Sequence, residues 1–124
     1  MEHSELSGSV ILAAMRVHTE LGPGLLESVY ESCLEMELNE LGFSVAKQVD
    51  IPVYYKGKPM GFGFRADLIV EKTIIIELKS VESLQPIHKA QLISYMKLMR
   101  LPIGLLINFN TPHLRDGIRR LALR

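Results

Sequence analysis

The sequence contains a single cysteine, Cys33, among its 124 residues. One cysteine excludes an internal disulfide and a zinc cluster built on cysteines, which favours a reducing compartment, and we expect the cytoplasm. No apolar run approaches the ~20 residues of a membrane span, and the polar, acidic residues 1–9 do not resemble a signal peptide. The sequence also lacks linkers, repeats and low-complexity segments, so we expect residues 1–124 to form one domain that has no contact with a membrane.

The net charge is zero, but the charges are unevenly distributed along the chain. Residues 1–40 carry eight acids and one base, whereas residues 41–124 carry thirteen bases and six acids, which gives −7 against +7. The basic part could face a polyanion while the acidic part faces away from it. A mixed solvated surface explains the same distribution, so charge alone does not establish nucleic-acid binding.

Hydrophobic spacing and Gly/Pro breaks predict an α/β chain with helices at both ends. A final helix would display Arg115, Arg119, Arg120 and Arg124 as a basic ridge for phosphates or as a solvated face. Pro52 indicates an edge position or a bulge in its strand. The expected helices are 4–20, 25–41, 87–100 and 113–123, and the expected strands are 44–55, 60–70, 73–81 and 103–108.

Three charged residues fall inside runs that otherwise indicate buried strands: Asp67, Glu77 and Lys79. Such residues are almost never fully buried unless they form ion pairs or have a functional role. If Val70 pairs with Ile74 across a three-residue turn, Asp67 stands opposite Glu77, and all three charged residues share one face. A two-residue turn would place the two acids on opposite faces.

Two helices could bring further polar groups to that face. Glu27 lies at the edge of the apolar stripe of its helix, where it could join the site or simply offset the helix macrodipole. His88, Gln91 and Tyr95 fall on one side of the helix at 87–100. They could reach the same face of the sheet, or they could form a polar helix edge.

This combination suits metal-dependent phosphodiester hydrolysis, which needs hard oxygen ligands, an activated water and charge neutralisation. Asp67 and Glu77 could bind Mg²⁺ or Mn²⁺ together with the carbonyl of Leu78, and Glu27 could complete the site directly or through water. Lys79 could orient the attacking water and stabilise developing charge. A structural alternative is a cross-strand ion pair between Lys79 and an acid.

The whole arrangement resembles the PD-(D/E)XK nuclease superfamily, and more closely the GxxExxY family within it. The motif that names the family is present as GLLESVY at residues 24–30. The other stretches that carry the resemblance are LGPG at 21–24, RAD at 65–67, IELK at 76–79, PIHKAQL at 86–92 and GLLINF at 104–109.

The resemblance implies a restriction-endonuclease-like αβββαβ core, a mixed sheet flanked by helices, with an added N-terminal and C-terminal helix. It implies that Glu27, Asp67, Glu77, Lys79 and Gln91 are catalytic and that Glu27, Asp67 and Glu77 hold the metal. The candidates for substrate binding are Tyr30, Arg65, His88 and Tyr95.

We therefore expect a Mg²⁺-dependent nuclease-like phosphodiesterase, with DNA as its substrate and a homodimer as a possible assembly. The alternative is a catalytically weak or silent module of the same fold that binds nucleic acid or a protein. A third reading is a structural α/β domain whose acids form ion pairs. Fold analogy alone gives neither substrate nor activity.

Overall fold

The computed structural model describes residues 1–123, except for the side chain of Phe62. Within that part of the chain, no helix is long and apolar enough to cross a membrane. The elements in chain order are α1 (His3–Leu21), α2 (Glu27–Glu40), β1 (Val45–Tyr55), β2 (Lys58–Val70), β3 (Ile74–Lys79), α3 (Pro86–Met99), β4 (Ile103–Asn108), the 3₁₀ helix η1 (Leu114–Gly117) and β5 (Ile118–Ala122).

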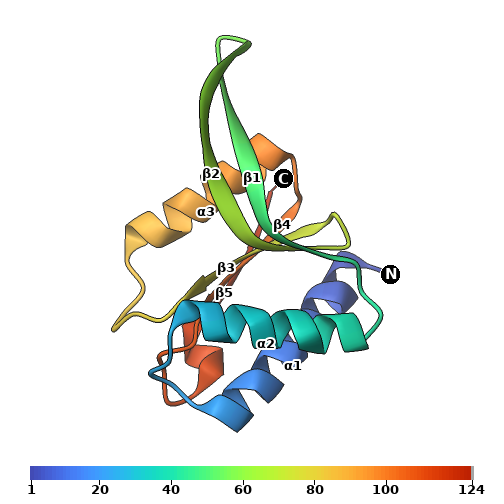
Figure 1. Ribbon diagram of the computed structural model, residues 1–124, viewed down its shortest axis with the longest axis vertical. Helices are drawn as coiled ribbons and strands as arrows, with labels where there is room; N and C mark the ends of the chain where they lie inside the picture. The colour runs from blue at the N-terminus through green and yellow to red at the C-terminus, as the bar shows by residue number, and fades with distance from the viewer. Residues whose placement is uncertain (124) are drawn as a thin grey trace.

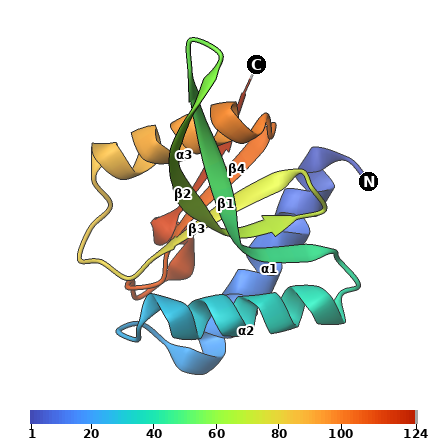
Figure 2. The ribbon, with the colours of Figure 1, turned by 45° about the horizontal axis from the view of Figure 1, so that its top comes forward.

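The five strands form one mixed sheet in the order β1-β2-β3-β4-β5. Only β3 and β4 run parallel, and α3 supplies the crossover between them, as a parallel pair requires. Helices α1 and α2 cover one face and α3 covers the other, which gives three layers (Figures 1 and 2). The expected α/β class, with a mixed sheet flanked by helices, is therefore confirmed.

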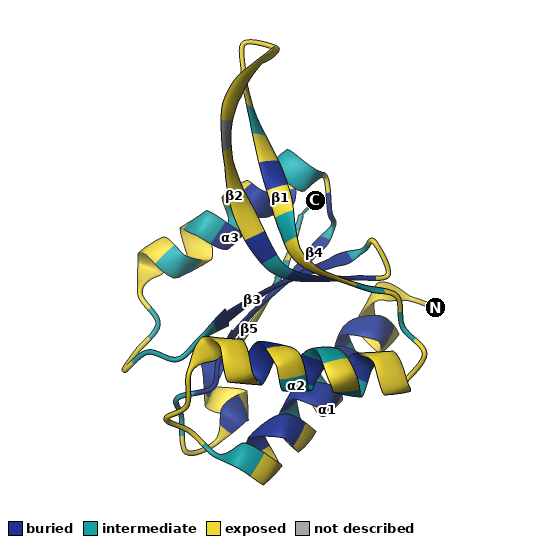
Figure 3. Ribbon diagram, viewed as in Figure 1, coloured by how far each residue is buried: buried dark blue, intermediate teal, exposed yellow. Residues whose placement is uncertain are grey.

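Each face of the sheet has its own apolar core. Leu68, Ile74 and Ile76 pack with α1 and α2, whereas Ile69 and Ile75 pack with α3. This alternation is the two-residue period of a strand buried on both sides. Figure 3 shows the result as a continuous buried centre through β3 and β4.

The β2–β3 turn has the length on which the site depends. Val70 pairs with Ile74, so Glu71, Lys72 and Thr73 form the turn. Glu71 and Lys72 adopt left-handed conformations, with φ of 52° and 50°. This odd-length turn puts Asp67 in register with Glu77 and confirms the geometric condition that the sequence left open.

The β1–β2 hairpin twists sharply beside Asp67. Gln48, between Lys47 and Val49, has φ of 50°, which is unusual for a residue within a strand. On β2, Leu68 belongs to the core under α2, whereas Ala66, two residues away, belongs to the core under α3. The hairpin therefore changes faces at Asp67 and then projects beyond the sheet (Figure 1). A register shift follows between Pro52 and Tyr54, as expected for an edge strand with a bulge.

The predicted C-terminal helix is wrong. Residues 114–117 form a 3₁₀ turn, and Ile118–Ala122 form β5, which pairs antiparallel with β4. Ile118 and Leu121 are spaced as in a helix, but β4 would otherwise leave a row of unpaired backbone groups along its second edge. That non-local demand overrides the local pattern. The expected arginine ridge does not form, because Arg119 and Arg120 are consecutive in β5 and point to opposite faces; Arg124 lies outside the described residues.

Candidate active site

Asp67 and Glu77 are joined through the backbone at the point where β2 leaves β3. The β2–β3 ladder covers Leu68 to Val70. Next to it, the N–H of Asp67 donates to Oε1 of Glu77 at 3.2 Å, and the N–H of Leu78 donates to Oδ2 of Asp67 at 2.7 Å. The carboxylate oxygens accept hydrogen bonds that backbone carbonyls would accept in a regular ladder. The two acids therefore lie close together where the two strands separate.

The pair is electrostatically strained in the absence of a cation. Glu77 is 6% exposed, and burial, followed by the nearby charge of Asp67, raises its pKa to about 8. Burial also raises the pKa of Asp67, against the lowering effects of the Leu78 N–H and of Lys79. A buried Glu77 and a half-buried Asp67 that repel each other are stabilised by a proton or by a cation held between them.

Lys79 extends from β3 two residues beyond Glu77. Its charge acts on both carboxylates and lowers both pKa values. Among the described residues, the ion pairs are Arg16–Glu37, Lys47–Glu35 and Arg65–Asp50, so Lys79 makes no direct ion pair there. This weakens the purely structural reading of Lys79.

The backbone on either side of Lys79 is held by β4. The Lys79 carbonyl accepts the Phe109 N–H at 2.9 Å. The side chain of Asn108, 2% exposed, accepts the Val81 N–H at 3.1 Å and donates to the Val81 carbonyl at 3.0 Å. The Asn108 carboxamide thus acts as a strand backbone would, and it fixes the chain as it leaves β3.

Glu27 reaches the same region from the first turn of α2. Its Oε2 accepts the N–H of Ser80 at 3.2 Å, while the Ser80 hydroxyl donates to the carbonyl of Leu25 at 2.6 Å. The charge of Glu27 raises the pKa values of Asp67 and Glu77. Helix α2 is therefore docked onto the end of β3, and Glu27 lies near the acid pair.

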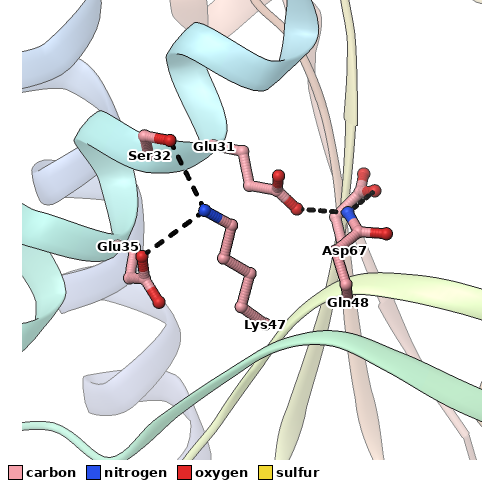
Figure 4. Close-up of polar contacts among 6 residues, drawn as sticks. All are labelled: Glu31, Ser32, Glu35, Lys47, Gln48 and Asp67. Carbon is pink, nitrogen blue, oxygen red and sulfur yellow. Dashed lines mark hydrogen bonds and ion pairs between the residues drawn. The ribbon is translucent and has the colours of Figure 1, made fainter.

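Sequence reasoning missed Gln48 and Glu31. The Gln48 side-chain amide donates to Oε1 of Glu31 and, at 3.4 Å, to Oδ1 of Asp67 (Figure 4). Glu31 is buried and lies one helical turn after Glu27, a spacing that could have signalled it. Nothing in the sequence marks Gln48, because its role depends on its left-handed backbone.

A small cavity of about 200 Å³ lies at this junction, lined by Glu27, Ser28, Glu31, Gln48 and Asp67. Within residues 1–123, no three His, Cys, Asp or Glu side chains converge closely enough to hold a metal ion by themselves. Asp67 and Glu77 are thus a two-carboxylate pair, with Glu27 nearby. A larger cavity of about 640 Å³, at His18 and His113, contains none of the expected site residues.

Helix α3 brings Tyr95 near the acid pair, and Gln91 lies beside Tyr95. Tyr95 is buried, and burial, followed by the charges of Glu77 and Asp67, raises its pKa. The side chain of Gln91 acts in the opposite direction and lowers the pKa of Tyr95. His88 instead accepts the N–H of Gln85 at 3.0 Å in the capping box of α3.

Tyr30 and Arg65 lie away from the acid pair. Tyr30 is fully buried: its hydroxyl donates to the Gly22 carbonyl at 2.6 Å and accepts the Leu25 N–H at 3.1 Å, and its ring stacks on Phe109 at 4.3 Å. Tyr30 thus has no exposed surface for a substrate. Arg65 is exposed on the projecting hairpin and pairs with Asp50 at 3.3 Å.

The mixed sheet between helices, with an acid pair and a lysine where β2 leaves β3, is consistent with the restriction-endonuclease-like class of nucleases. A family model described as the PD-(D/E)XK nuclease superfamily matches residues 4–121, so the chain belongs to that superfamily. Searches of curated proteins and of solved structures gave no significant match. Membership indicates a nuclease-like function for the chain.

Proposed function

We propose that the protein is a phosphodiester hydrolase that requires Mg²⁺ or Mn²⁺ and acts on DNA. The proposal rests mainly on the pair of Asp67 and Glu77. Each of the two carboxylates accepts a hydrogen bond from the backbone of the other strand, and Lys79 follows on β3. A buried Glu77 next to a half-buried, repelling Asp67 has little structural purpose, because the pair costs stability unless a cation or proton neutralises it.

The donor set fits a hard divalent cation. Mg²⁺ is usually held by one or two carboxylates, together with waters and substrate phosphates. Asp67 and Glu77 would supply the carboxylates and the Leu78 carbonyl a third oxygen. When bound, the metal would act as a Lewis acid on the phosphate and lower the pKa of a bound water.

The remaining residues would position the attacking water and the substrate and neutralise the charge on the phosphate. The Lys79 ammonium would orient the attacking water and stabilise charge that develops on the phosphate oxygens. Glu27 would hold the end of β3 through Ser80 and contact the site through water. Gln91 would fix the Tyr95 hydroxyl beside the acids, where it could contact the substrate.

Several finer points belong to the same proposal. DNA as substrate is supported by the basic balance of residues 41–124. The GLLESVY motif and the stretches around it support a place in the GxxExxY family. A cytoplasmic location, and a homodimer that would present two sites to two strands, complete the proposal.

The rival is a binding module that has lost catalysis. It is favoured by the lack of three converging metal-ligand side chains within residues 1–123. Such a module would bind nucleic acid or a protein without cleaving it and would not need Lys79.

The deciding experiment combines cleavage and thermal-shift measurements. We expect Mn²⁺ or Mg²⁺ to raise the melting temperature of the wild type and to support cleavage of DNA. Asp67→Asn keeps an oxygen for the Leu78 N–H but removes the charge, so it should abolish both responses and remain folded. Lys79→Met should abolish cleavage alone.

Glu40→Gln is the matched control for loss of an acid, because exposed Glu40 lies at the far end of α2, about 20 Å from Glu27. It should leave both responses unchanged. A wild type that binds DNA but shows neither a metal-dependent shift nor cleavage would support the rival reading.

A further inference from the structure

The outer part of the β1–β2 hairpin, residues 51–64, forms an arm that packs against α3 at its base and projects beyond the sheet and the helices at its turn (Figures 1 and 2). The ladder between β2 and β3 begins only at Leu68, so the arm extends past that ladder. Its sequence contains two lysines and no acid. Figure 3 shows that most of it is exposed.

Three residues near the turn form a basic and aromatic cluster. Tyr55 pairs with Lys58 across the hairpin, so the two side chains share a face. The Lys56 ammonium lies 5.6 Å from the centroid of the Tyr55 ring, within cation–π range. Tyr55 is nevertheless 63% exposed, so a large aromatic side chain is open to solvent beside two lysines.

The chemistry of this cluster matches single-stranded nucleic acid. Proteins that bind single strands stack bases on exposed aromatic rings and follow the backbone with positive charge. In a duplex the base faces are already stacked on one another, so the ring would have no partner there. A two-fold contact with a second copy would bring the lysines of both arms together without acids to neutralise them.

The arm is continuous with the candidate active site through β2. Phe64, at its base, contacts the Tyr95 ring with centroids 5.5 Å apart, and Asp67 follows three residues later. From Lys58 to Asp67 an extended strand spans at most about 30 Å. A strand held at the tip would therefore be bound far from the bond that is cleaved.

We propose that Tyr55, Lys56 and Lys58 form a docking site for an unpaired segment of nucleic acid that continues along β2 to the acid pair. The choice of nucleic acid as the ligand rests on the proposed nuclease function. It adds that this substrate contains a single-stranded part. It also assigns the arm to binding, with no part in the chemical step.

The test measures binding in EDTA, where cleavage cannot contribute. The probe is fluorescein-labelled oligo-deoxythymidine, compared with the same strand annealed to oligo-deoxyadenosine, and the readout is fluorescence anisotropy. Tyr55→Ala should weaken binding of the single strand about tenfold, the loss expected for one stacked base. Lys56→Gln with Lys58→Gln should reduce the slope of log affinity against log salt by about 1.4.

Tyr54 is a matched control for Tyr55. It is 58% exposed and adjacent, but it pairs with Pro59 and lies on the opposite face. Tyr54→Ala should leave the affinity unchanged. Lys72→Gln, in the exposed β2–β3 turn, serves in the same way for the lysines and should leave the salt slope unchanged.

Three results would overturn the proposal: equal effects of Tyr54→Ala and Tyr55→Ala, equally tight binding of strand and duplex, or a dimer in light scattering that Tyr55→Ala dissociates. The two proposals can fail separately. If no metal supports cleavage but the difference between Tyr54 and Tyr55 persists, the docking site stands and the nuclease proposal falls. If cleavage occurs and Tyr55→Ala leaves both affinity and KM unchanged, the reverse holds.

Discussion

The backbone N–H of Asp67 donates to Oε1 of Glu77 at 3.2 Å, while the N–H next to Glu77, that of Leu78, donates to Oδ2 of Asp67. Each acid therefore accepts a hydrogen bond that an ordinary ladder would give to a carbonyl. Removing either side chain exposes an unsatisfied N–H as well as deleting a charge. Amide substitutions, which keep an oxygen in place, separate these two effects.

The first prediction concerns Glu77→Gln. The amide keeps an acceptor for the Asp67 N–H but removes the charge that burial and Asp67 oppose. We expect the variant to be as stable as the wild type or more stable in EDTA at pH 8, and to lose the Mn²⁺-dependent rise in melting temperature. Differential scanning fluorimetry measures both. A variant that responds to Mn²⁺ like the wild type would remove Glu77 from the metal site.

The second prediction concerns the pH dependence of stability without metal. The pKa of Glu77 rises from 4.5 to about 8 on folding. Below pH 4.5 both states hold the proton, and between pH 4.5 and about 8 only the folded state does. Stability should therefore fall as pH rises through this window, by at most about 1.4 kcal/mol per pH unit, and then level off.

The raised pKa of Asp67 acts in the same direction. Urea denaturation in EDTA at several pH values gives the profile, and its difference from the Glu77→Gln profile isolates the contribution of Glu77. A difference that stays flat between about pH 5 and 8 would show that Glu77 is ionised in the folded protein.

The third prediction concerns Gln48→Ala. The change removes the amide that bridges buried Glu31 and Asp67, so the free energy of unfolding should fall by about 1–3 kcal/mol. Lys47→Ala, the neighbouring substitution, breaks an exposed ion pair with Glu35 and should cost less than about 1 kcal/mol. Equal losses in urea denaturation would argue against the bridge.

The fourth prediction concerns Tyr30→Phe. The variant keeps the ring on Phe109 but loses the hydroxyl that joins Gly22 to Leu25. We expect a loss of about 1–2 kcal/mol in stability and unchanged affinity for nucleic acid. A stable variant with weakened binding would restore Tyr30 to the substrate-binding set.

The sequence predicted the acid pair because the strand period is local and strict. The sequence did not predict the turn length that sets the register, because Glu71 and Lys72 adopt left-handed conformations in a turn that contains no glycine to indicate them. The role of Gln48 could not be predicted for the same reason, because Gln48 also adopts a left-handed conformation. Residues 118–122 form a strand because they pair with residues 103–107, which lie 11 to 19 positions earlier, and local helical spacing carries no information about that partner.

The carboxamide of Asn108 holds the backbone next to Lys79 in place. Asn108 takes no part in the proposed chemistry, yet its two hydrogen bonds to Val81, together with the Phe109–Lys79 bond, anchor the end of β3 to β4. The backbone that carries Lys79 is thus held in part by a neutral residue on an otherwise apolar strand. An alteration at Asn108 would shift the lysine relative to the acid pair while every acid and base of the site stayed intact, and the loss would be one of alignment.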